Sequence, residues 1–374
     1  MPEIQAVILA AGEGTRLRPL TKNRPKVMLP VANRPILEHV LNSVVAAGIR
    51  DITVVVGYKK EQVMTFLNTY PIPVNVVVQE KQLGTAHALS RAKEYIHTTT
   101  LVLAGDNYVD PQSLRAIMDK ENALLVAPHS SPANFGVISR DDGRLTGIME
   151  KPAGVEPGSL VSCGIYIFTQ EFILKIRENT IPESLQNRMN EGMRISVVTA
   201  NDWQDAIYPK DLLSVNKHLL KDLKGYISGS IDKSVTIQGR AAAGRKTSIG
   251  PGTVLLGPAM IGEGSVIGPH VCIGPNTSIG SRVTIEPFTY IENSIIMNDC
   301  RIGSHSRIVD TILGEGCLCM NHLSTVSEPF GAVCGDRTTI GPFTVIKGGV
   351  IGNDVTIQGG KTLEKEIPDN SMVI

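Results

Sequence analysis

The sequence predicts a two-domain protein, with an α/β domain followed by an all-β domain of six-residue repeats. Three observations support this fold class. Short apolar runs alternate with helical patterns over residues 1 to about 225, which is typical of an α/β sheet. After residue 227 the apolar residues recur with a period of six, and the length of 374 residues is enough for two separate cores. We therefore expect domains at residues 1–225 and 226–374.

The first domain is expected to hold a parallel sheet with helices between its strands. The run Ala6-Val7-Ile8-Leu9 is typical of a buried parallel strand. In such sheets ligands collect at the carboxyl ends of the strands, so residues that follow a strand are candidates for a site. Runs of this kind predict strands at 4–9, 51–56, 74–78 and 100–104, and helical patterns predict helices at 35–47, 59–67, 85–95, 111–119 and 209–224.

The second domain is predicted from aliphatic residues spaced six apart. Neither a helical period of about 3.6 nor a strand period of about 2 explains this spacing, but a solenoid of short strands and turns does. The phase slips near 294–302 and recovers at Ile340. The repeat resembles the left-handed parallel β-helix of the hexapeptide-repeat acyltransferases, which implies a homotrimer or a multiple of it. The positions in phase are 231, 237, 243, 249, 255, 261, 267, 273, 279, 285 and 291.

The composition argues against several functional classes. Lys plus Arg and Asp plus Glu number 36 each, so no nucleic-acid or membrane-surface partner is expected. No apolar run approaches the ~18 residues of a membrane span, and Met1-Pro2-Glu3 lacks the basic start of a signal peptide. The six cysteines form no Cys-x-x-Cys pair, which favours reduced, buried thiols in a cytoplasmic protein over a metal site.

The first predicted strand ends in a loop of small residues. Alanines and glycines there let backbone N–H groups approach phosphate oxygens and the edge of a base, and Arg16 and Lys26 add two positive charges. A Walker A loop would need Gly-Lys-Ser/Thr after the last glycine, and a dinucleotide fingerprint would need glycine where Leu17 stands. An ordinary glycine turn remains the alternative. The candidate nucleotide-binding residues of this loop are Leu9, Ala10, Ala11, Gly12, Gly14 and Thr15.

This loop together with Pro25-Lys26 resembles the signature of the sugar-1-phosphate nucleotidylyltransferases. These enzymes join a nucleoside triphosphate to a sugar 1-phosphate and release pyrophosphate. The resemblance implies a Rossmann-like nucleotidyltransferase domain in which Arg16 and Lys26 are catalytic. With the β-helix included, the whole chain resembles the bifunctional N-acetylglucosamine-1-phosphate uridylyltransferase/glucosamine-1-phosphate acetyltransferases and the glucose-1-phosphate thymidylyltransferases.

A polar segment after the strand at 74–78 is the candidate base-recognition site. In the uridylyl- and thymidylyltransferases the positions that match Gln79, Gly84 and Thr85 hold the base, and Gln82 lies in the same segment. A purely local alternative is that Thr85 caps the helix that follows, and both can hold at once. We interpret His87 as a packing or helix-start residue rather than a catalyst.

Two aspartates are the candidate metal ligands. Asp106 follows the strand at 100–104, where a carboxylate is well placed to hold a hard cation that bridges phosphates. Gly105-Asp106-Asn107 is also a good turn sequence. The resemblance places Asp205, in Trp203-Gln204-Asp205, as the second ligand of Mg²⁺, although a helix-start aspartate is the alternative.

The sugar side is assigned through the resemblance alone. It places Gly136 against the sugar, Glu150 on the sugar hydroxyls and Lys151 near the sugar phosphate as a catalytic residue. The segment Val161-Ser162-Cys163-Gly164-Ile165 matches a segment that often carries asparagine facing the sugar. This chain has Ser162 there, which leaves its sugar preference open.

The β-helix carries one catalytic candidate. Asn321-His322-Leu323-Ser324 resembles the segment whose histidine is the general base of the glucosamine-1-phosphate acetyltransferases, which use acetyl-CoA. Those enzymes continue with a further coil of acceptor and coenzyme residues. This chain lacks that coil, because Pro329 is followed at once by Phe330-Gly331. A structural or regulatory β-helix is therefore equally consistent with the sequence.

The leading hypothesis is a Mg²⁺-dependent transfer of a nucleotidyl group from UTP or dTTP to a sugar 1-phosphate. N-acetylglucosamine 1-phosphate is favoured because a hexapeptide domain is attached, with glucose 1-phosphate as the alternative. A rival of another class is a non-catalytic regulatory or scaffold relative. The presence of Arg16, Lys26, Asp106 and Asp205 argues against that rival and against a pure acyltransferase.

Overall fold

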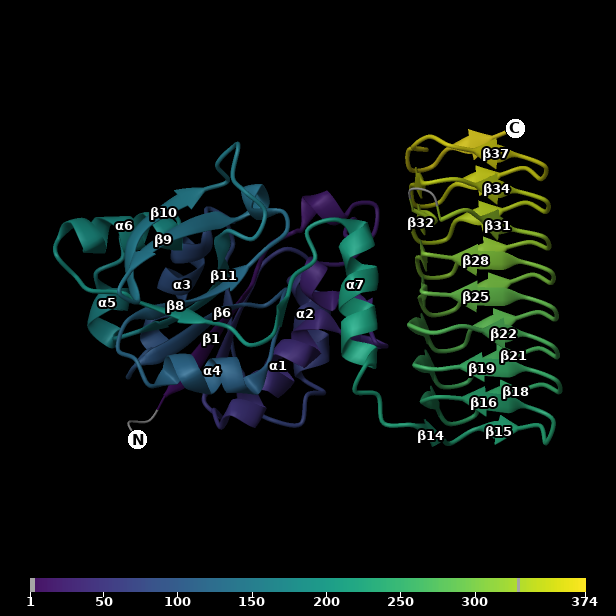
Figure 1. The fold of residues 1–374 in the computed structure, drawn as a ribbon, viewed down its shortest axis with the longest axis horizontal. Helices are drawn as coiled ribbons and strands as arrows, with labels where there is room; N and C mark the ends of the chain where they lie inside the picture. Colours follow the sequence, from purple (N-terminus) through teal and green to yellow (C-terminus); the bar gives the residue numbers. More distant parts are fainter. Residues whose placement is uncertain (1–3, 328–329) are drawn as a thin grey trace. The chain divides into compact units, whose positions relative to one another are not determined.

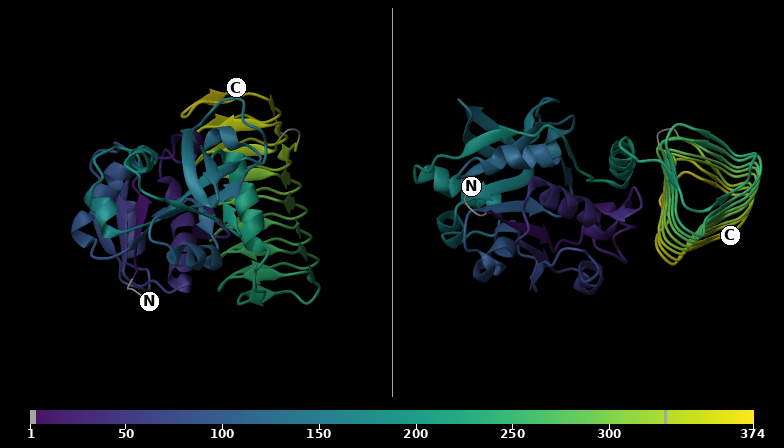
Figure 2. Two further views of the ribbon diagram at one scale, coloured as in Figure 1. Left: turned by 60° about the vertical axis from the view of Figure 1, so that its left-hand side comes forward. Right: turned by 90° about the horizontal axis from the view of Figure 1, so that it is seen from below.

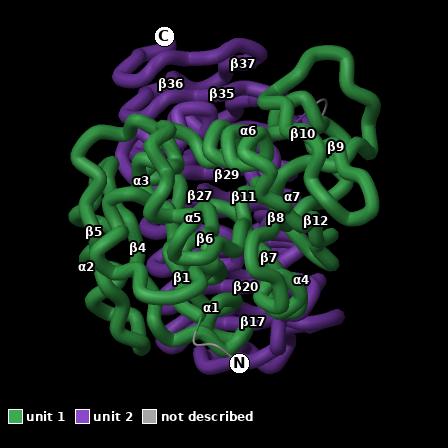
Figure 3. Tube along the Cα trace, turned by 90° about the vertical axis from the view of Figure 1, so that its left-hand side faces the viewer, with its two compact units in different colours: residues 1–13, 25–28, 36–205 green, residues 14–24, 29–35, 206–374 purple. Residues whose placement is uncertain are grey.

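The computed structural model describes residues 4–327 and 330–374. By its internal contacts the chain divides into two units, which Figure 3 distinguishes by colour. The first unit contains the residues up to Glu13, Pro25–Met28 and Ile36–Asp205, and the second contains Gly14–Arg24, Leu29–Pro35 and Ala206–Ile374. Two short pieces near the start of the chain are therefore grouped with the β-helix. The predicted domain boundary near residue 225 stays a prediction.

A single twisted sheet forms the centre of the first unit (Figure 1). Its strands β1, β4, β5 and β6 coincide with the predicted strands to within one residue at each end. Strands β1, β4 and β6 are short, mostly aliphatic runs that are almost entirely buried, whereas the valines of the edge strand β5 are half-buried. In spatial order the strands are β5 (Asn75–Val78), β4 (Ile52–Val56), β1 (Gln5–Ala10), β6 (Thr100–Ala104), β11 (Leu160–Phe168), β8 (Ala123–Pro128), β12 (Ser196–Thr199), β10 (Arg144–Glu150) and β9 (Gly136–Asp141).

The sheet is mixed, which corrects the prediction of a parallel sheet. Strand β11 runs antiparallel to both β6 and β8, and β10 runs antiparallel to β9 and β12. The apolar pattern predicts that a strand is buried but carries no information on its direction, which the connections decide. Strands β5, β4, β1 and β6 run parallel to one another, as predicted.

Helices cover both faces of this sheet (Figures 1 and 2). Apolar residues of α3, α5 and α6 pack with alternate residues of β1, β4, β6 and β8 in one cluster, and α1 and α4 pack against each other on the other face. A two-stranded sheet of β7 (Tyr108–Val109) and β13 (Trp203–Gln204) lies beside the main sheet. The helices are α1 (Ile36–Ala47), α2 (Lys60–Leu67), α3 (Thr85–Arg91), α4 (Pro111–Met118), α5 (Gln170–Leu174) and α6 (Ile181–Asn190).

The second unit begins with short elements and continues as a solenoid. The chain forms a 3-10 turn at Thr15–Leu17, the hairpin β2 (Pro30–Val31) and β3 (Arg34–Pro35), and α7 (Pro209–Leu220). Each strand after α7, apart from the last strand of each sheet, pairs in parallel with the strand one coil further on. The three resulting sheets give the triangular section in the right-hand view of Figure 2 and are consistent with the predicted left-handed β-helix.

The three sheets have these strands. The first contains β14 (Tyr226–Ile227), β17 (Ala241–Ala243), β20 (Ala259–Ile261), β23 (Thr277–Ile279), β26 (Ile295–Ile296), β29 (Thr311–Leu313), β32 (Ala332–Cys334) and β35 (Gly349–Ile351). The second contains β15 (Ser230–Ile231), β18 (Ser248–Ile249), β21 (Val266–Ile267), β24 (Thr284–Ile285), β27 (Arg301–Ile302), β30 (Leu318–Cys319), β33 (Thr339–Ile340), β36 (Thr356–Ile357) and β38 (Met372–Val373). The third contains β16 (Thr236–Gln238), β19 (Val254–Leu256), β22 (Cys272–Ile273), β25 (Tyr290–Glu292), β28 (Arg307–Val309), β31 (Ser324–Thr325), β34 (Val345–Ile346) and β37 (Thr362–Leu363).

The in-phase aliphatic residues form the core of the β-helix. From residue 243 onwards each in-phase position is buried, and the isoleucine and leucine side chains among them contribute about 1.5–3 kcal/mol each. Ile231 and Ile237 remain 38% and 40% exposed because the first coil has a neighbouring coil on one side only. The phase slip near 294–302 arises because the coil pairing Ile285 with Ile302 has 17 residues, whereas the coil pairing Ile249 with Ile267 has 18.

All six cysteines are free, and five of them are buried. Burial raises the pKa of the thiols of Cys163, Cys319 and Cys334, which disfavours the reactive thiolate.

We expect an alkylating reagent at pH 8 to label at most one thiol in the folded protein, that of half-buried Cys272, and all six in denaturant. Mass spectrometry of the labelled protein measures this, and native labelling of Cys319 would contradict it.

None of the helices within residues 4–327 and 330–374 combines the length and apolar character needed to cross a membrane.

Candidate active site

A buried lysine joins the two candidate metal ligands in the first unit. The Nζ atom of Lys26 lies 2.8 Å from Oδ2 of Asp106 and 3.1 Å from Oδ1 of Asp205. The lysine side chain is 11% exposed, and those of Asp106 and Asp205 are 34% and 12% exposed. The structure thus brings together three residues that are 80 or more positions apart in the sequence, and the two carboxylates meet at one positive charge.

The two-stranded sheet explains why these carboxylates meet. Strands β7 and β13 are antiparallel, with Gln204 opposite Tyr108. Continuing this register by one residue sets Asp205 opposite Asn107, beside Asp106. Asp110 fixes the pairing, since its side chain accepts hydrogen bonds from the backbone N–H of Asp202 and from the first turn of α4. The two interpretations of Gly105-Asp106-Asn107 are therefore compatible: the segment can form a turn and also bring Asp106 to the candidate site.

The charge state of Lys26 follows from these contacts. Burial alone would lower the pKa of Lys26, but the charges and hydrogen bonds of Asp106 and Asp205 outweigh burial and raise it above its ordinary value. The ammonium group therefore remains protonated at neutral pH. A lysine ammonium held in a fixed position is one of the groups that can stabilise a transferring phosphoryl group.

The loop after β1 is divided between the two units. Leu9, Ala10, Ala11 and Gly12 belong to the first unit, and a side chain built on Gly12 would meet no atom within 4 Å. Glycine is therefore not needed there for packing, and its backbone is open to an approaching group. Gly14, Thr15 and Arg16 belong to the second unit; Gly14 has a left-handed backbone with φ of 77°, and the Thr15 and Arg16 side chains are exposed.

The predicted base-recognition segment is held by internal hydrogen bonds. Nε2 of buried Gln79 donates to the carbonyl oxygen of Gly84 at 3.2 Å and lies 2.8 Å from Nδ1 of His87. Nε2 of Gln82 donates to the carbonyl oxygen of Gln79 at 3.2 Å. These bonds fix the path of the chain into α3 and agree with the interpretation of His87 as a packing residue.

Thr85 does not cap its own helix, which corrects that local alternative. Helix α3 begins at Thr85, and no side chain caps it. The Thr85 hydroxyl instead accepts a hydrogen bond of 3.0 Å from the backbone N–H of Ile181, at the start of α6. Gly84 also contacts the chain before α6, because a Cβ built on it would lie 2.3 Å from the carbonyl oxygen of Asn179.

One pocket in the first unit unites the base and sugar candidates. It has a volume of about 660 Å³, within the range of small-molecule sites. Five predicted residues line it, from both the base segment and the sugar side: Gly84, Thr85, Gly136, Glu150 and Ser162. Sequence reasoning missed the other lining residues, which come from β10, β11, α6 and its flank: Ile148, Gly164, Tyr166, Thr180, Pro182, Glu183 and Gln186.

The sugar-side residues share local contacts. Gly136 pairs with Glu150 across β9 and β10, and a Cβ on Gly136 would lie 2.7 Å from Oε1 of Glu150, so glycine leaves room for that carboxylate. Oγ of Ser162 lies 3.2 Å from the hydroxyl of Tyr166. Burial raises the pKa of Tyr166 to about 12, and the charge of Glu150 adds to the shift while the bond to Ser162 opposes it. The phenol is thus a neutral group in the pocket wall.

Comparison with known proteins identifies the family. The model described as "Nucleotidyl transferase" matches residues 5–222, more than half of the chain. The chain belongs to the nucleotidyl transferase family. A second model, "GMPPB C-terminal domain", matches residues 255–368. The predicted resemblance to sugar-1-phosphate nucleotidylyltransferases is confirmed, and this nucleotidyl transferase is an enzyme of that type.

Individual relatives agree with this assignment. "Bifunctional protein GlmU" of Methanococcus vannielii is 32% identical, and the alignment covers 99% of this chain and 97% of the relative. "Glucose-1-phosphate thymidylyltransferase" of Streptomyces antibioticus is 32% identical over 70% of this chain and 78% of the relative. The solved structure of "UDP-glucose pyrophosphorylase from acinetobacter baumanii" has a TM-score of 0.53 at 21% identity and covers 59% of this chain and 94% of its own, which supports the fold alone.

Lys151 occupies an unusual backbone conformation in the nucleotidyl transferase. It is exposed and has a φ of 45°, a left-handed value that costs energy for a residue with a side chain. Its backbone N–H donates to the carbonyl oxygen of Phe135 at 2.9 Å. The ring of Phe135 packs edge-on against Trp203 with a centroid distance of 5.5 Å. The sugar-side motif and the motif that carries Asp205 therefore share one aromatic contact.

His322 lies on a corner of the β-helix, not in an enclosed site. It is exposed, with a φ of 60°, and its ring stacks between His305 and Phe343 at centroid distances of 5.0 Å and 4.5 Å. His270 and Phe288 continue the same column of rings. A pocket of about 680 Å³ lies beside the column and includes Asn321, Met320 and His305 in its lining.

Glu178 anchors α6, the helix that forms one wall of the pocket lined by the base and sugar candidates. Its carboxylate accepts hydrogen bonds from Asn187 and Ser184 of α6 at 2.7 Å and 2.9 Å. Burial would raise the pKa of Glu178, but the bonds from Asn187, from the backbone N–H groups of Arg177 and Glu178, and from Ser184 lower it to about 2.

Because the folded pKa of Glu178 is depressed, its stabilising contribution is present above the ordinary value of 4.5 and is lost as the pH falls towards 2. We expect the wild type to exceed Glu178→Gln in free energy of unfolding at pH 6, and the difference to shrink below pH 4.5. Urea unfolding at several pH values measures it. A difference that does not change with pH would contradict this role.

Proposed function

We propose that this protein transfers a nucleotidyl group from UTP or dTTP to a sugar 1-phosphate, most favourably N-acetylglucosamine 1-phosphate. The observation that carries the proposal is the meeting of Lys26 with Asp106 and Asp205 in the same unit as a pocket lined by both base and sugar candidates. The name of the Streptomyces relative, "Glucose-1-phosphate thymidylyltransferase", supports glucose 1-phosphate and dTTP as one candidate substrate pair. Glucose 1-phosphate is the alternative acceptor.

The carboxylates of Asp106 and Asp205 suit Mg²⁺. This ion is commonly held by one or two carboxylates together with substrate phosphates, and the two side chains already converge on one cationic group. When bound, Mg²⁺ would supply charge neutralisation at the triphosphate. Asp106 and Asp205 would hold it, and Lys26 would remain as the neighbouring fixed charge.

The remaining steps need no protein nucleophile. An oxygen of the sugar 1-phosphate attacks the α-phosphorus, a new P–O bond forms, and the bond to the leaving pyrophosphate breaks. Arg16 and Lys26 stabilise the negative charge that develops on the α-phosphate and the leaving group. Lys151 orients the attacking phosphate, and the loop from Leu9 to Thr15 presents backbone N–H groups to the triphosphate.

The direct test is pyrophosphate release with Mg²⁺ across a grid of substrates. The grid crosses UTP, dTTP, ATP, CTP and GTP with the 1-phosphates of glucose, glucosamine, N-acetylglucosamine and mannose. We expect release with UTP or dTTP, and the acceptor with the highest kcat/KM names the product. Release with ATP alone, or no release from folded protein, would overturn the proposal. The second result would favour a non-catalytic regulatory or scaffold protein.

Acetyl transfer from acetyl-CoA to glucosamine 1-phosphate is the second candidate function, with His322 as base. The observations that favour it are the exposed His322 ring and the pocket beside its column, together with the word "bifunctional" in the relative's name. Chromatographic detection of N-acetylglucosamine 1-phosphate tests it. Formation that is lost in His322→Ala would support this activity, and no formation would leave the β-helix with a structural role.

Two further parts of the proposal concern the setting of the reaction. Six free cysteines suit a reducing compartment such as the cytoplasm. The β-helix would assemble the protein into a homotrimer or a multiple of it, which light scattering coupled to size-exclusion chromatography measures.

A further inference from the structure

The segment Gly14–Arg24 contains two candidate nucleotide-binding residues, Gly14 and Thr15, and the catalytic candidate Arg16. It belongs to the same compact unit as the β-helix. Its local fold is tight. The Thr21 hydroxyl, fully buried, donates to the carbonyl oxygen of Gly14 at 2.8 Å, and the side chains of Leu17 and Leu20 are buried. The positions of Gly14 and Arg16 therefore depend on the contacts that hold the C-terminal end of this segment in place.

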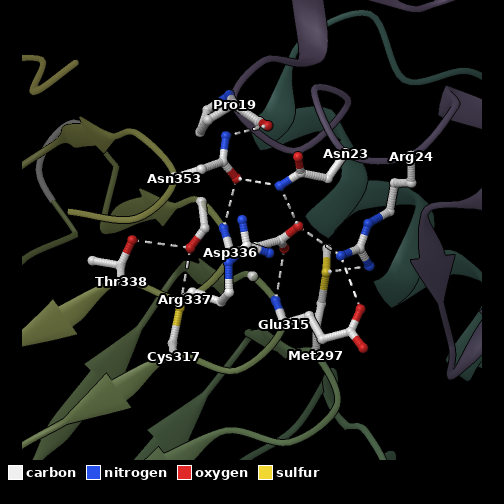
Figure 4. Close-up of polar contacts among 12 residues, drawn as sticks. Pro19, Asn23, Arg24, Met297, Glu315, Cys317, Asp336, Arg337, Thr338 and Asn353 are labelled. Atoms are coloured by element: carbon white, nitrogen blue, oxygen red, sulfur yellow. Dashed lines mark hydrogen bonds and ion pairs between the residues drawn. The ribbon is translucent and has the colours of Figure 1, made fainter. Parts of the chain in front are cut away.

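An ion pair with a buried carboxylate fixes that end (Figure 4). Nη2 of Arg24 lies 2.8 Å from Oδ2 of Asp336 and 2.9 Å from Oε2 of Glu315. The Asp336 side chain is only 1% exposed. A buried carboxylate whose partner is removed is strongly unfavourable, so Asp336 holds Arg24 far more firmly than a surface pair would.

An asparagine in the next coil adds a second tether. Nδ2 of Asn353, which is 2% exposed, donates to the carbonyl oxygen of Pro19 at 3.1 Å. The side chain of Asn23 donates to both Asp336, at 3.0 Å, and Asn353, at 3.3 Å. Figure 4 shows these bonds as one continuous network between residues 19–24 and the coils.

The negative charge of Asp336 exceeds what the β-helix itself requires. Oδ1 of Asp336 accepts from the backbone N–H of Glu315 in the preceding coil, at 2.9 Å. At the same corner of other coils, Asn298 and Asn353 make the same bond with an amide oxygen, to Ser281 and Asp336 at 2.9 Å and 2.8 Å. An asparagine would therefore serve the coil at position 336, and the extra charged oxygen is the one that faces Arg24.

A separate set of bonds holds the other short piece of the second unit. Oδ1 of Asn216, fully buried in α7, accepts from the backbone N–H of Ala32 at 2.8 Å, and the Asn33 side chain donates to the carbonyl oxygen of Ile279 at 2.6 Å. Residues 25–28, which carry Lys26, are the only four positions between the two tethered pieces. The chain on both sides of Lys26 is thus attached to the β-helix.

We propose that Arg24 and Asp336 are positioning residues of the nucleotidyl transfer, through which the β-helix fixes the nucleotide-binding segment 14–24. The inference rests on the proposed function for its kinetic consequence, but the tether itself is independent of the substrate. The tether gives the β-helix a part in nucleotidyl transfer, whether or not the β-helix also transfers acetyl groups. Because both residues act through Gly14–Arg16, neither is a catalytic residue.

The decisive variant is Asp336→Asn in the full-length protein. It keeps the bond between coils, as Asn298 and Asn353 do, but removes the charge that faces Arg24. We expect kcat/KM for the preferred nucleotide to fall roughly 10- to 100-fold, the range for slight misplacement of binding groups. The matched control is Asp299→Asn, which removes an exposed pair between Asp299 and Arg282 on the same corner and should change kcat/KM less than about two-fold.

Two more measurements separate positioning from simple loss of stability. In a double-mutant cycle, Arg24→Gln with Asp336→Asn should cost no more than either change alone. Tryptic cleavage within residues 16–24 should be faster in Asp336→Asn than in Asp299→Asn, with or without substrate. Wild-type kinetics and cleavage in Asp336→Asn would overturn the inference. Absence of activity in the wild type, with faster cleavage in Asp336→Asn, would reject the proposed function and leave the tether standing.

Discussion

Replacing Lys26 with alanine is expected to lower kcat for pyrophosphate release by about 10²–10³-fold, the range for loss of one preorganised charge at a transition state. Lys26 is the group that both candidate metal ligands contact, at 2.8 Å and 3.1 Å. Its removal takes away a positive charge and leaves two neighbouring carboxylates that repel each other and the incoming phosphates. Steady-state kinetics with the preferred substrate pair measures the effect.

The matched control for this variant is Lys60→Ala. Lys60 pairs with Glu80, whose side chain is 75% exposed, and an exposed pair of this kind contributes little. We expect Lys60→Ala to retain the wild-type kcat within about two-fold. Both variants should be compared for folding by circular dichroism, and a folded Lys26→Ala protein with wild-type turnover would remove Lys26 from the mechanism.

Replacing Gly84 with alanine is expected to destabilise the protein by about 2–4 kcal/mol, the combined scale of a steric clash and a strained backbone. The added Cβ would lie 2.3 Å from the carbonyl oxygen of Asn179, and Gly84 has a φ of +138°. The neighbouring atom belongs to the backbone before α6, so it has little freedom to move away. The free energy of urea unfolding measures the loss.

Gly12→Ala is the comparison for Gly84→Ala. The new methyl group at position 12 would meet no atom within 4 Å, so stability should change by less than about 0.5 kcal/mol. If Gly12 approaches a nucleotide as proposed, this variant should instead show a higher KM for the nucleoside triphosphate. Equal stability losses in the two variants would contradict the steric argument for Gly84.

The sequence predicted the residue types of the site but not their contacts. The apolar runs located β1 and β6, so Gly12 and Asp106 could be assigned to strand ends from local patterns. The contact of Lys26 with both aspartates depends on the pairing of Gln204 with Tyr108, which joins positions 96 residues apart. No local pattern indicates such a pairing. The sequence therefore predicted Lys26 as a catalytic residue and the two aspartates as metal ligands, without predicting that they touch.

Other features escaped prediction for related reasons. Tyr166 and Gln186 line the sugar-side pocket, but in the sequence they look like ordinary strand and helix residues. The pairing of Arg24 with Asp336 joins the start of the chain to a late coil, and a lone arginine near a proline gives no sign of its partner. By contrast, the six-residue period predicted the β-helix core correctly from residue 243 onwards, because each repeat contacts its neighbours in sequence order.

The unequal coils of the β-helix bear on how this protein's length can change over generations. Its register accepts 18 residues between Ile249 and Ile267, 17 between Ile285 and Ile302, and 21 between Leu313 and Cys334. The inward side chains of these pairs stay in register despite the different coil lengths. The stability of such an array is approximately a sum over coils. The insertion or loss of one whole coil therefore changes the free energy of unfolding but leaves the β-helix architecture unchanged. Evolution can thus adjust the length of this domain while each surviving coil keeps its architecture.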